Sequence, residues 1–209
     1  MAAMRIQQYI VSVCATNCYF IINDDTGEVL IIDPGASAIQ LAEKVKEHHL
    51  VPRGILLTHG HFDHAAAAEE LSQLLDVKIY AHEAEQETLE MPGLNLSIWE
   101  GTAENYHADV YLKDEQEFEL AGFKVRVLFT PGHTVGGCCY YFVEQGTVFS
   151  GDTLFEGSIG RTDFPKGSAS QLIRAIKDKL MVLPDDTAVY SGHGDMTGIG
   201  IERVNNPFL

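Results

Sequence analysis

Positively charged residues are scarce in this chain. Only 14 Lys and Arg residues stand against 30 Asp and Glu residues in a chain of 209 residues, which gives a formal net charge of −16 at pH 7. A general nucleic-acid binder needs a basic surface that faces the phosphate groups. The charge balance therefore predicts a protein that does not bind nucleic acid.

Long hydrophobic runs are also missing. No stretch is long and apolar enough to span a bilayer. Residues 9–22 resemble the apolar core of a signal peptide, but they include Ser12, Thr16 and Asn17 and lack a small-residue cleavage site. We therefore expect a cytoplasmic protein that does not attach to membranes.

Cysteine is limited to four residues, Cys14, Cys18, Cys138 and Cys139. Adjacent cysteines rarely pair with each other, and the cytoplasm keeps thiols reduced, so we expect no disulfides. All four residues lie in strand-like apolar stretches. This setting predicts small buried side chains and disfavours a zinc site made of cysteines.

The residues that are plentiful predict a mixed α and β protein. Hydrophobic residues make up 45% of the chain, which is enough for a sizeable core and for a single domain over residues 1–209. Alternating and buried apolar patterns predict strands at residues 5–13, 17–23, 28–32, 54–57, 78–81, 116–120, 123–129, 138–142, 147–150 and 187–190. Amphipathic patterns predict helices at residues 38–49, 65–75, 168–180 and 197–209. The order is typical of a duplicated half-unit, with two sheets face to face and helices outside.

The most informative stretch lies between the expected strand 54–57 and the expected helix 65–75. It contains His59, His61, Asp63 and His64 within six residues. Neutral imidazoles and a carboxylate are ligands for zinc, iron or manganese. One tetrahedral ion could not take all four from so short a turn. The spacing therefore predicts two adjacent ions, one on His59 and His61 and the other on Asp63 and His64.

This motif, His59-x-His61-x-Asp63-His64, resembles the signature of the metallo-β-lactamase superfamily. That family also uses a lone His, a bridging Asp and a final His, and residues 130–134, 150–153 and 191–194 supply them in that order. The resemblance implies an α+β fold, the four-layer αββα sandwich, with the metals at one edge. It also implies a ligand set: His59, His61 and His133 for the first metal, Asp63, His64 and His193 for the second, and Asp152 bridging both.

The implied chemistry is hydrolysis with two divalent ions per chain, expected to be zinc, with iron or manganese as alternatives. Two adjacent ions lower the pKa of a shared water, which attacks a carbonyl while one ion stabilises the developing oxyanion. As ligands of these ions, Asp63 and Asp152 are expected to be catalytic.

The stretch 151–165 resembles the small glyoxalase II-like branch of the superfamily, which hydrolyses S-acyl thiols. We therefore expect a small-molecule acyl-thiol substrate. The chain ends before the helical domain with which glyoxalase II holds glutathione, so we expect inefficient use of glutathione thioesters. The sequence Gly-Arg-Thr-Asp at residues 160–163 also occurs in persulfide dioxygenases, which use one iron. Persulfide dioxygenase activity is therefore the alternative function. Hydrolysis of another ester, a lactone or a phosphoester is a third possibility.

Four further residues are candidates for supporting roles. Asp33, at the end of an expected strand, could accept the free N–H of a ligating imidazole or simply form an Asp-Pro-Gly turn. Arg161 and Lys166 are the basic residues nearest the site in sequence and could meet a substrate carboxylate, although Arg161 could pair with Asp163 instead. Trp99, the only Trp, lies in the irregular stretch Met91–His107.

That stretch is predicted either to cover or wall the site or to be a loop packed on the core. His82 follows a strand end without a second ligand nearby, so we expect a capping or surface role for it.

Overall fold

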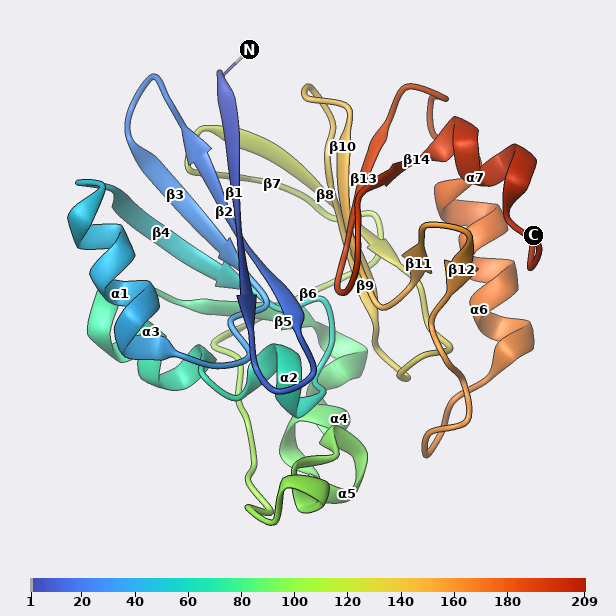
Figure 1. Ribbon diagram of the computed structural model, residues 1–209, viewed down its shortest axis with the longest axis horizontal. Helices are drawn as coiled ribbons and strands as arrows, with labels where there is room; N and C mark the ends of the chain where they lie inside the picture. The colour runs from blue at the N-terminus through green and yellow to red at the C-terminus, as the bar shows by residue number, and fades with distance from the viewer. Residues whose placement is uncertain (1) are drawn as a thin grey trace.

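Two six-stranded sheets pack face to face, with helices on their outer sides (Figure 1). This is the architecture of a computed structural model that describes residues 2–209. The four layers confirm the predicted αββα sandwich. No helix among the described residues is both long and apolar enough to cross a bilayer.

The first sheet has the strand order β1-β2-β3-β4-β5-β6. Its strands are β1 (Met4–Val11), β2 (Thr16–Asn23), β3 (Glu28–Ile32), β4 (Val51–Leu56), β5 (Ile79–His82) and β6 (Val110–Leu112). The first three form an antiparallel meander, whereas β3 to β6 are parallel. Parallel neighbours need crossover connections. Helices α1 (Ala38–Glu47) and α3 (Ala68–Leu75) lie in the first two of these connections, on the outer face.

The second sheet has the order β14-β13-β10-β9-β8-β7. Its strands are β7 (Glu117–Leu120), β8 (Phe123–Phe129), β9 (Cys138–Phe142), β10 (Thr147–Gly151), β13 (Ala188–Ser191) and β14 (Thr197–Gly198). A small hairpin, β11 (Leu154–Phe155) and β12 (Ser158–Ile159), follows β10. Outside this sheet lie α6 (Ala169–Ala175), its π-helical continuation Ile176–Leu180, and α7 (Ile199–Asn205).

Strand β2 shows how the layers are held together. Every residue of this strand is buried, and successive side chains enter different clusters. Phe20 and Ile22 pack under the helices of the first half, while Tyr19 and Ile21 enter the core between the sheets. A strand that is buried on both faces has a continuous run of apolar residues in its sequence, which is why β2 was predictable.

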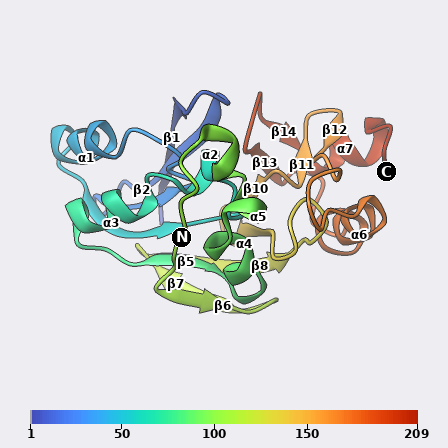
Figure 2. The same cartoon turned by 90° about the horizontal axis from the view of Figure 1, so that it is seen from below.

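Short helices lie across the end of the seam between the two halves, as Figure 2 shows for α4 and α5. This region contains a 3₁₀ turn (Glu83–Glu85), α4 (Gln86–Glu90), α5 (Pro92–Asn95) and a second 3₁₀ turn (Ser97–Glu100).

Three predictions from the sequence need correction. The expected helix 197–209 begins with the short strand β14, and only Ile199–Asn205 is helical. The expected helix 65–75 is two helices, α2 (Phe62–Ala65) and α3, so the His59–His64 motif itself runs into a helical turn. Cys18, Cys138 and Cys139 are buried as predicted, but Cys14 is exposed. The reason is that β1 ends at Val11 and the chain turns over residues 12–15, which carries Cys14 out of the sheet.

Candidate metal centre

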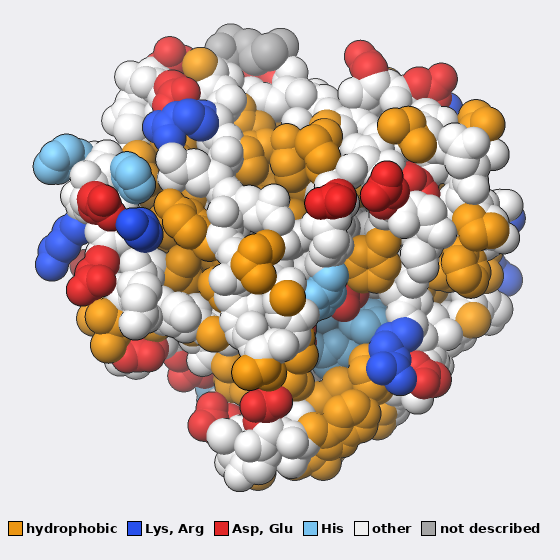
Figure 3. Space-filling model, in the orientation of Figure 1, with side chains coloured by type: hydrophobic (Ala, Val, Ile, Leu, Met, Phe, Trp, Pro, Cys, Tyr) orange, Lys and Arg blue, Asp and Glu red, His pale blue; other side chains and the backbone are white. Residues whose placement is uncertain are grey.

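Histidine side chains form the floor of a hollow on the face drawn in Figure 3. They come from loops at one edge of the sandwich, where several strands end. His59 and His61 follow β4, and His64 lies in α2. His133 follows β8, and His193 follows β13. Two halves of the fold thus contribute side chains to one place.

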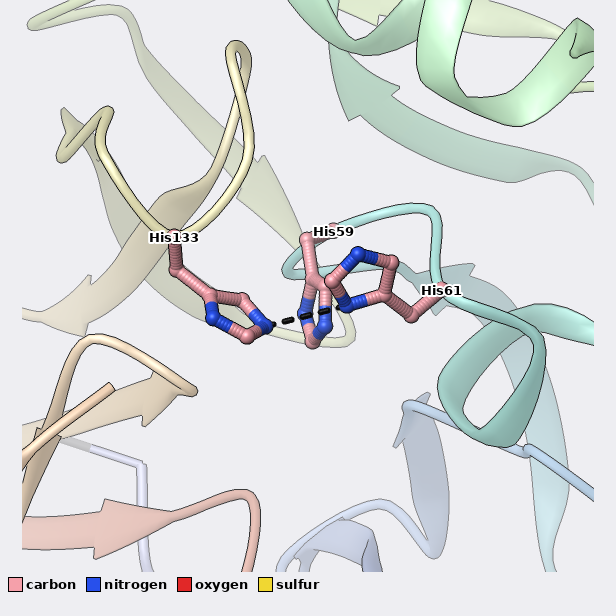
Figure 4. Close-up of side chains that lie close together, drawn as sticks. All are labelled: His59, His61 and His133. Carbon is pink, nitrogen blue, oxygen red and sulfur yellow. Dashed lines mark hydrogen bonds between the residues drawn. The ribbon is translucent and has the colours of Figure 1, made fainter. Parts of the chain in front are cut away.

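The first group of side chains consists of His59, His61 and His133, which Figure 4 shows converging. One nitrogen from each ring lies within 4.8 Å of the others. The ring nitrogens His133 Nε2 and His61 Nδ1 face each other at 3.0 Å. Three imidazoles with nitrogens this close are suited to share one cation.

The second group consists of Asp63, His64 and His193. One carboxylate oxygen and one nitrogen from each ring lie within 4.8 Å of one another. His64 Nε2 and His193 Nε2 are 3.3 Å apart. Thr16 donates its hydroxyl hydrogen to Asp63 Oδ2 at 2.8 Å and so fixes that carboxylate.

Asp152 lies between the two groups. Its Oδ2 is 3.5 Å from His133 Nε2 of the first group and 3.5 Å from His193 Nε2 of the second. Its Oδ1 is 3.4 Å from His64 Nε2. A carboxylate in this position is able to serve both groups at once.

The donor set fits divalent cations. His59 Nε2 and Asp152 Oδ1 are buried and have no hydrogen-bond partner among the described residues. Burying polar atoms without a partner costs free energy, which a bound cation would remove. Burial, reinforced by neighbouring histidines, holds the pKa of His59 well below its ordinary value and lowers that of His61 to about 3. Both rings are therefore neutral near pH 7, which is the form that binds metal.

The second group has a negative environment. Burial opposes protonation of His64, but the carboxylates of Asp63, Asp152 and Asp33 outweigh it and raise its pKa well above the ordinary value. A site whose acids stabilise a proton on a buried imidazole will also stabilise a metal cation.

Asp33 lies behind His64. Its Oδ2 is 2.9 Å from His64 Nδ1 and accepts the hydroxyl hydrogen of Thr58 at 2.6 Å, while its Oδ1 accepts the Thr58 backbone N–H at 2.8 Å. With Nδ1–H directed at Asp33, Nε2 of His64 is free to face the cluster. In the same way, His133 Nδ1 is directed at the backbone oxygen of Arg161, at 2.7 Å.

Glu85 is a functional candidate that the sequence reasoning missed. It is fully buried and accepts hydrogens from Gly60 N at 2.8 Å, Gly136 N at 2.6 Å and the Thr134 hydroxyl at 3.0 Å. Burial raises the pKa of Glu85 to about 7, although these donors oppose the shift. One carboxylate therefore ties the turn that carries His59 and His61 to the loop that carries His133.

A cavity of about 590 Å³ opens above the cluster, with His61, Asp63, His133, Asp152 and His193 on its floor. The same cavity is lined by Trp99 and Arg161.

The other candidates lie as follows. Arg161 is bound by both oxygens of Asp163, at 2.7 Å each. Lys166 does not line the cavity and pairs with Glu87. His82 is buried and accepts the Ala84 backbone N–H, so it caps the turn after β5 and does not lie at the surface.

The stretch Met91–His107 both packs on the core and walls the cavity. Leu96 and Tyr106 are buried, and Asn95 donates to the backbone oxygens of Leu89 and Glu104. Trp99 is 62% exposed and lies at the cavity. This segment therefore combines the two roles that were predicted as alternatives, packing on the core and forming a wall of the cavity.

Comparison with known proteins places these features in a family. The model of the metallo-beta-lactamase superfamily matches residues 11–193. The chain is 41% identical to the probable metallo-hydrolase YqgX of Bacillus subtilis, over 92% of each chain. It is 38% identical to the hydroxyacylglutathione hydrolase GloC of Haemophilus influenzae, over 99% of this chain and 98% of the relative.

Two solved structures are similar over nearly the whole chain. The B3 metallo-beta-lactamase BLEG-1 superposes with a TM-score of 0.92 at 39% identity, covering 98% of this chain and 99% of its own. A di-iron-bound form of TTHA1623 superposes with a TM-score of 0.84 at 34% identity, covering 97% and 100%.

The position of Asp152 predicts an unequal effect of two substitutions. Asp152→Ala should lower metal content at both sites and remove activity, because the carboxylate lies within reach of both groups of ligand-type residues. His193→Ala should empty mainly one site. Elemental analysis of dialysed protein measures both effects, and Asp195→Ala, an exposed neighbour on the same loop, is the control. Full occupancy of two metals in Asp152→Ala would contradict the assignment.

The contacts of Glu85 predict a loss of both stability and metal affinity in Glu85→Gln. The amide nitrogen cannot accept a hydrogen, so Gly60 or Gly136 would leave a buried N–H unpaired at a cost of about 1–3 kcal/mol. Metal affinity should fall by about 10–100-fold because the ligand loops lose their common anchor. Denaturant unfolding and chelator competition measure these changes. Glu83 is exposed in the same turn, so Glu83→Gln should change neither the free energy of unfolding nor the metal affinity. Equal changes of these two quantities in both variants would show that Glu85 does not position the loops.

Proposed function

The chain belongs to the metallo-beta-lactamase superfamily, whose hydrolases depend on metal, and we propose that it is a binuclear, glyoxalase II-like hydrolase of S-acyl thiols. The observation that carries the two-metal part of the proposal is the position of Asp152. It lies within 3.5 Å of imidazole nitrogens from both groups of ligand-type residues. The similarity to GloC supports the thioester part.

Each residue at the floor has a role in this proposal. His59, His61 and His133 would hold one ion, Asp63, His64 and His193 the other, and Asp152 both. Two ions, when bound, supply a Lewis acid for the acyl carbonyl and a water of lowered pKa. The protein keeps His64 in the correct tautomer through Asp33, and Glu85 holds the two ligand loops at a fixed separation.

Zinc is the ion that we propose, because imidazole and carboxylate ligands suit it. The di-iron form of TTHA1623 supports iron as the second candidate. A cytoplasmic location, the absence of a nucleic-acid partner and a single domain over residues 1–209 stay predictions from the sequence.

The alternative function is a persulfide dioxygenase with one iron. It uses a single ion and so needs only part of this set of ligand-type residues. The second group favours the hydrolase, because Asp63, His64 and His193 are assembled as closely as the first group and have supporting partners of their own in Thr16 and Asp33.

One set of measurements decides between these functions. Elemental analysis of the purified protein should find about two divalent ions per chain, the number that binuclear hydrolysis uses. S-lactoylglutathione should be hydrolysed, with thiol release detected by a chromogenic disulfide, and chelation should abolish the reaction. Glutathione persulfide should cause no oxygen uptake. A single iron per chain with oxygen consumption and no thiol release would overturn the proposal in favour of the dioxygenase.

A further inference from the structure

The walls of the cavity are chemically unlike its floor. Apart from the ligand-type residues, its lining is mostly apolar and comes from four separate segments: Cys14, Phe62, Leu96, Trp99, Phe155, Ile159 and Phe164. Figure 3 shows hydrophobic side chains gathered directly beside the histidines of the hollow. Pockets with apolar walls and a few convergent polar groups are typical of sites that bury most of a small ligand.

Trp99 and Phe164 form an aromatic pair on this wall. Their ring centroids are 5.3 Å apart in an edge-to-face arrangement. Phe164 is in turn 5.3 Å from the ring of His61, so the aromatic surface runs down to the floor. A Trp that is 62% exposed beside such a cavity leaves a large apolar area for a ligand to cover.

The segment that carries Trp99 is held in place before any ligand arrives. Ser97, two residues before Trp99, exchanges hydrogen bonds with the backbone of Glu104, at 2.9 and 3.0 Å. Leu96, next to Ser97, is buried at 3% exposure. Because the segment is already ordered, a ligand would lose little affinity to ordering it.

Positive charge at the walls is already neutralised. Among the described residues that line the cavity, Arg161 is the single Lys or Arg. Asp163 binds its guanidinium with both oxygens, and the guanidinium lies 4.1 Å from the centroid of Phe164. Glu100 adds a negative charge to the same lining. An anionic substrate arm would find no unpaired cation on these walls.

We infer that this cavity selects acyl thiols whose thiol arm is uncharged and apolar, with an aromatic arm packed against Trp99 and Phe164. The inference rests on the proposed thioester hydrolysis for the reaction itself. In that reaction the oxygen of water bonds to the acyl carbon and the C–S bond breaks. The products are a carboxylic acid and the free thiol, whose arm is the part that the aromatic wall holds.

The first test compares two thioesters of similar leaving groups, S-acetyl benzyl mercaptan and S-acetyl 3-mercaptopropionate. The metal-loaded protein should show a KM at least about tenfold lower for the benzyl compound, the effect of burying an apolar group of that size. The two kcat values should be similar, because the wall contributes binding and not stabilisation of the transition state. Equal KM values, or a lower KM for the carboxylate, would overturn the inference.

Substitutions then locate the effect. Trp99→Ala should raise KM for the benzyl thioester by about tenfold and leave KM for the carboxylate thioester within about twofold. Ile98→Ala is the matched control, since Ile98 is an exposed apolar residue in the same 3₁₀ turn that does not line the cavity. The same KM changes in both variants would show that Trp99 has no special contact with the arm.

A binding measurement separates this inference from the proposed function. Benzyl ethyl sulfide and 3-(ethylthio)propionate keep the two arms but cannot be hydrolysed. Fluorescence of Trp99, the only Trp, should report binding of each compound. The benzyl compound should bind at concentrations at least about tenfold lower than 3-(ethylthio)propionate does, with and without metal. Phe164→Ala should weaken this binding, whereas Phe208→Ala, which removes an exposed Phe outside the cavity, should not.

The outcomes are distinguishable. Preferential binding of the benzyl sulfide without hydrolysis of any thioester would refute the proposed function and leave the apolar arm site standing. Hydrolysis of thioesters with no preference for the benzyl arm in either assay would refute the arm site and leave the proposed function standing.

Discussion

The burial of acidic and imidazole groups at one edge of the sandwich is the constraint on which the rest of the structure depends. Asp152 has an oxygen without a hydrogen-bond partner among the described residues, and His59 has a buried nitrogen in the same condition. Such groups are costly unless they face a compensating charge. Backbones also approach this centre closely: a side chain at Gly192 would collide with Asp152, and one at Gly160 would collide with its backbone oxygen. The fold thus uses glycine where the ligands must come together.

Two other buried carboxylates organise the loops around this centre. Asp33 joins the end of β3 to Thr58 and His64, and Glu85 joins the turn after β4 to the loop after β8. The Asp33 bonds hold the ligand-type residues within the first half, and the Glu85 bonds cross from the loops of the first sheet to those of the second. Positions fixed in this way cost the protein little reorganisation when a cation binds.

The sequence predicts the parts of this structure that depend on local spacing. The turn with His59, His61, Asp63 and His64 is recognisable because its donors lie within one short segment, and the buried strands because of their apolar runs. The distant residues His133, Asp152 and His193 were identifiable only through a family resemblance, since nothing in their spacing brings them together. Glu85 was missed, although a signal exists: it precedes the buried Leu89 by one helical repeat and so lies on the inner face. Cys14 was misplaced because the end of β1 depends on pairing with β2.

The floor and the walls of the cavity belong to different kinds of segment. The floor residues lie at or just after the ends of strands in the two sheets. Apart from Phe62, which belongs to the His59–His64 motif, the walls come from the turn 12–15, the stretch 91–107, the β11–β12 hairpin and the loop that follows it. Insertions and exchanges in surface loops disturb a folded core far less than changes within strands. A scaffold divided in this way can acquire new substrate ranges by remodelling its rim while its hydrolytic centre stays intact. The same division offers protein engineers a natural boundary at which to graft foreign loops.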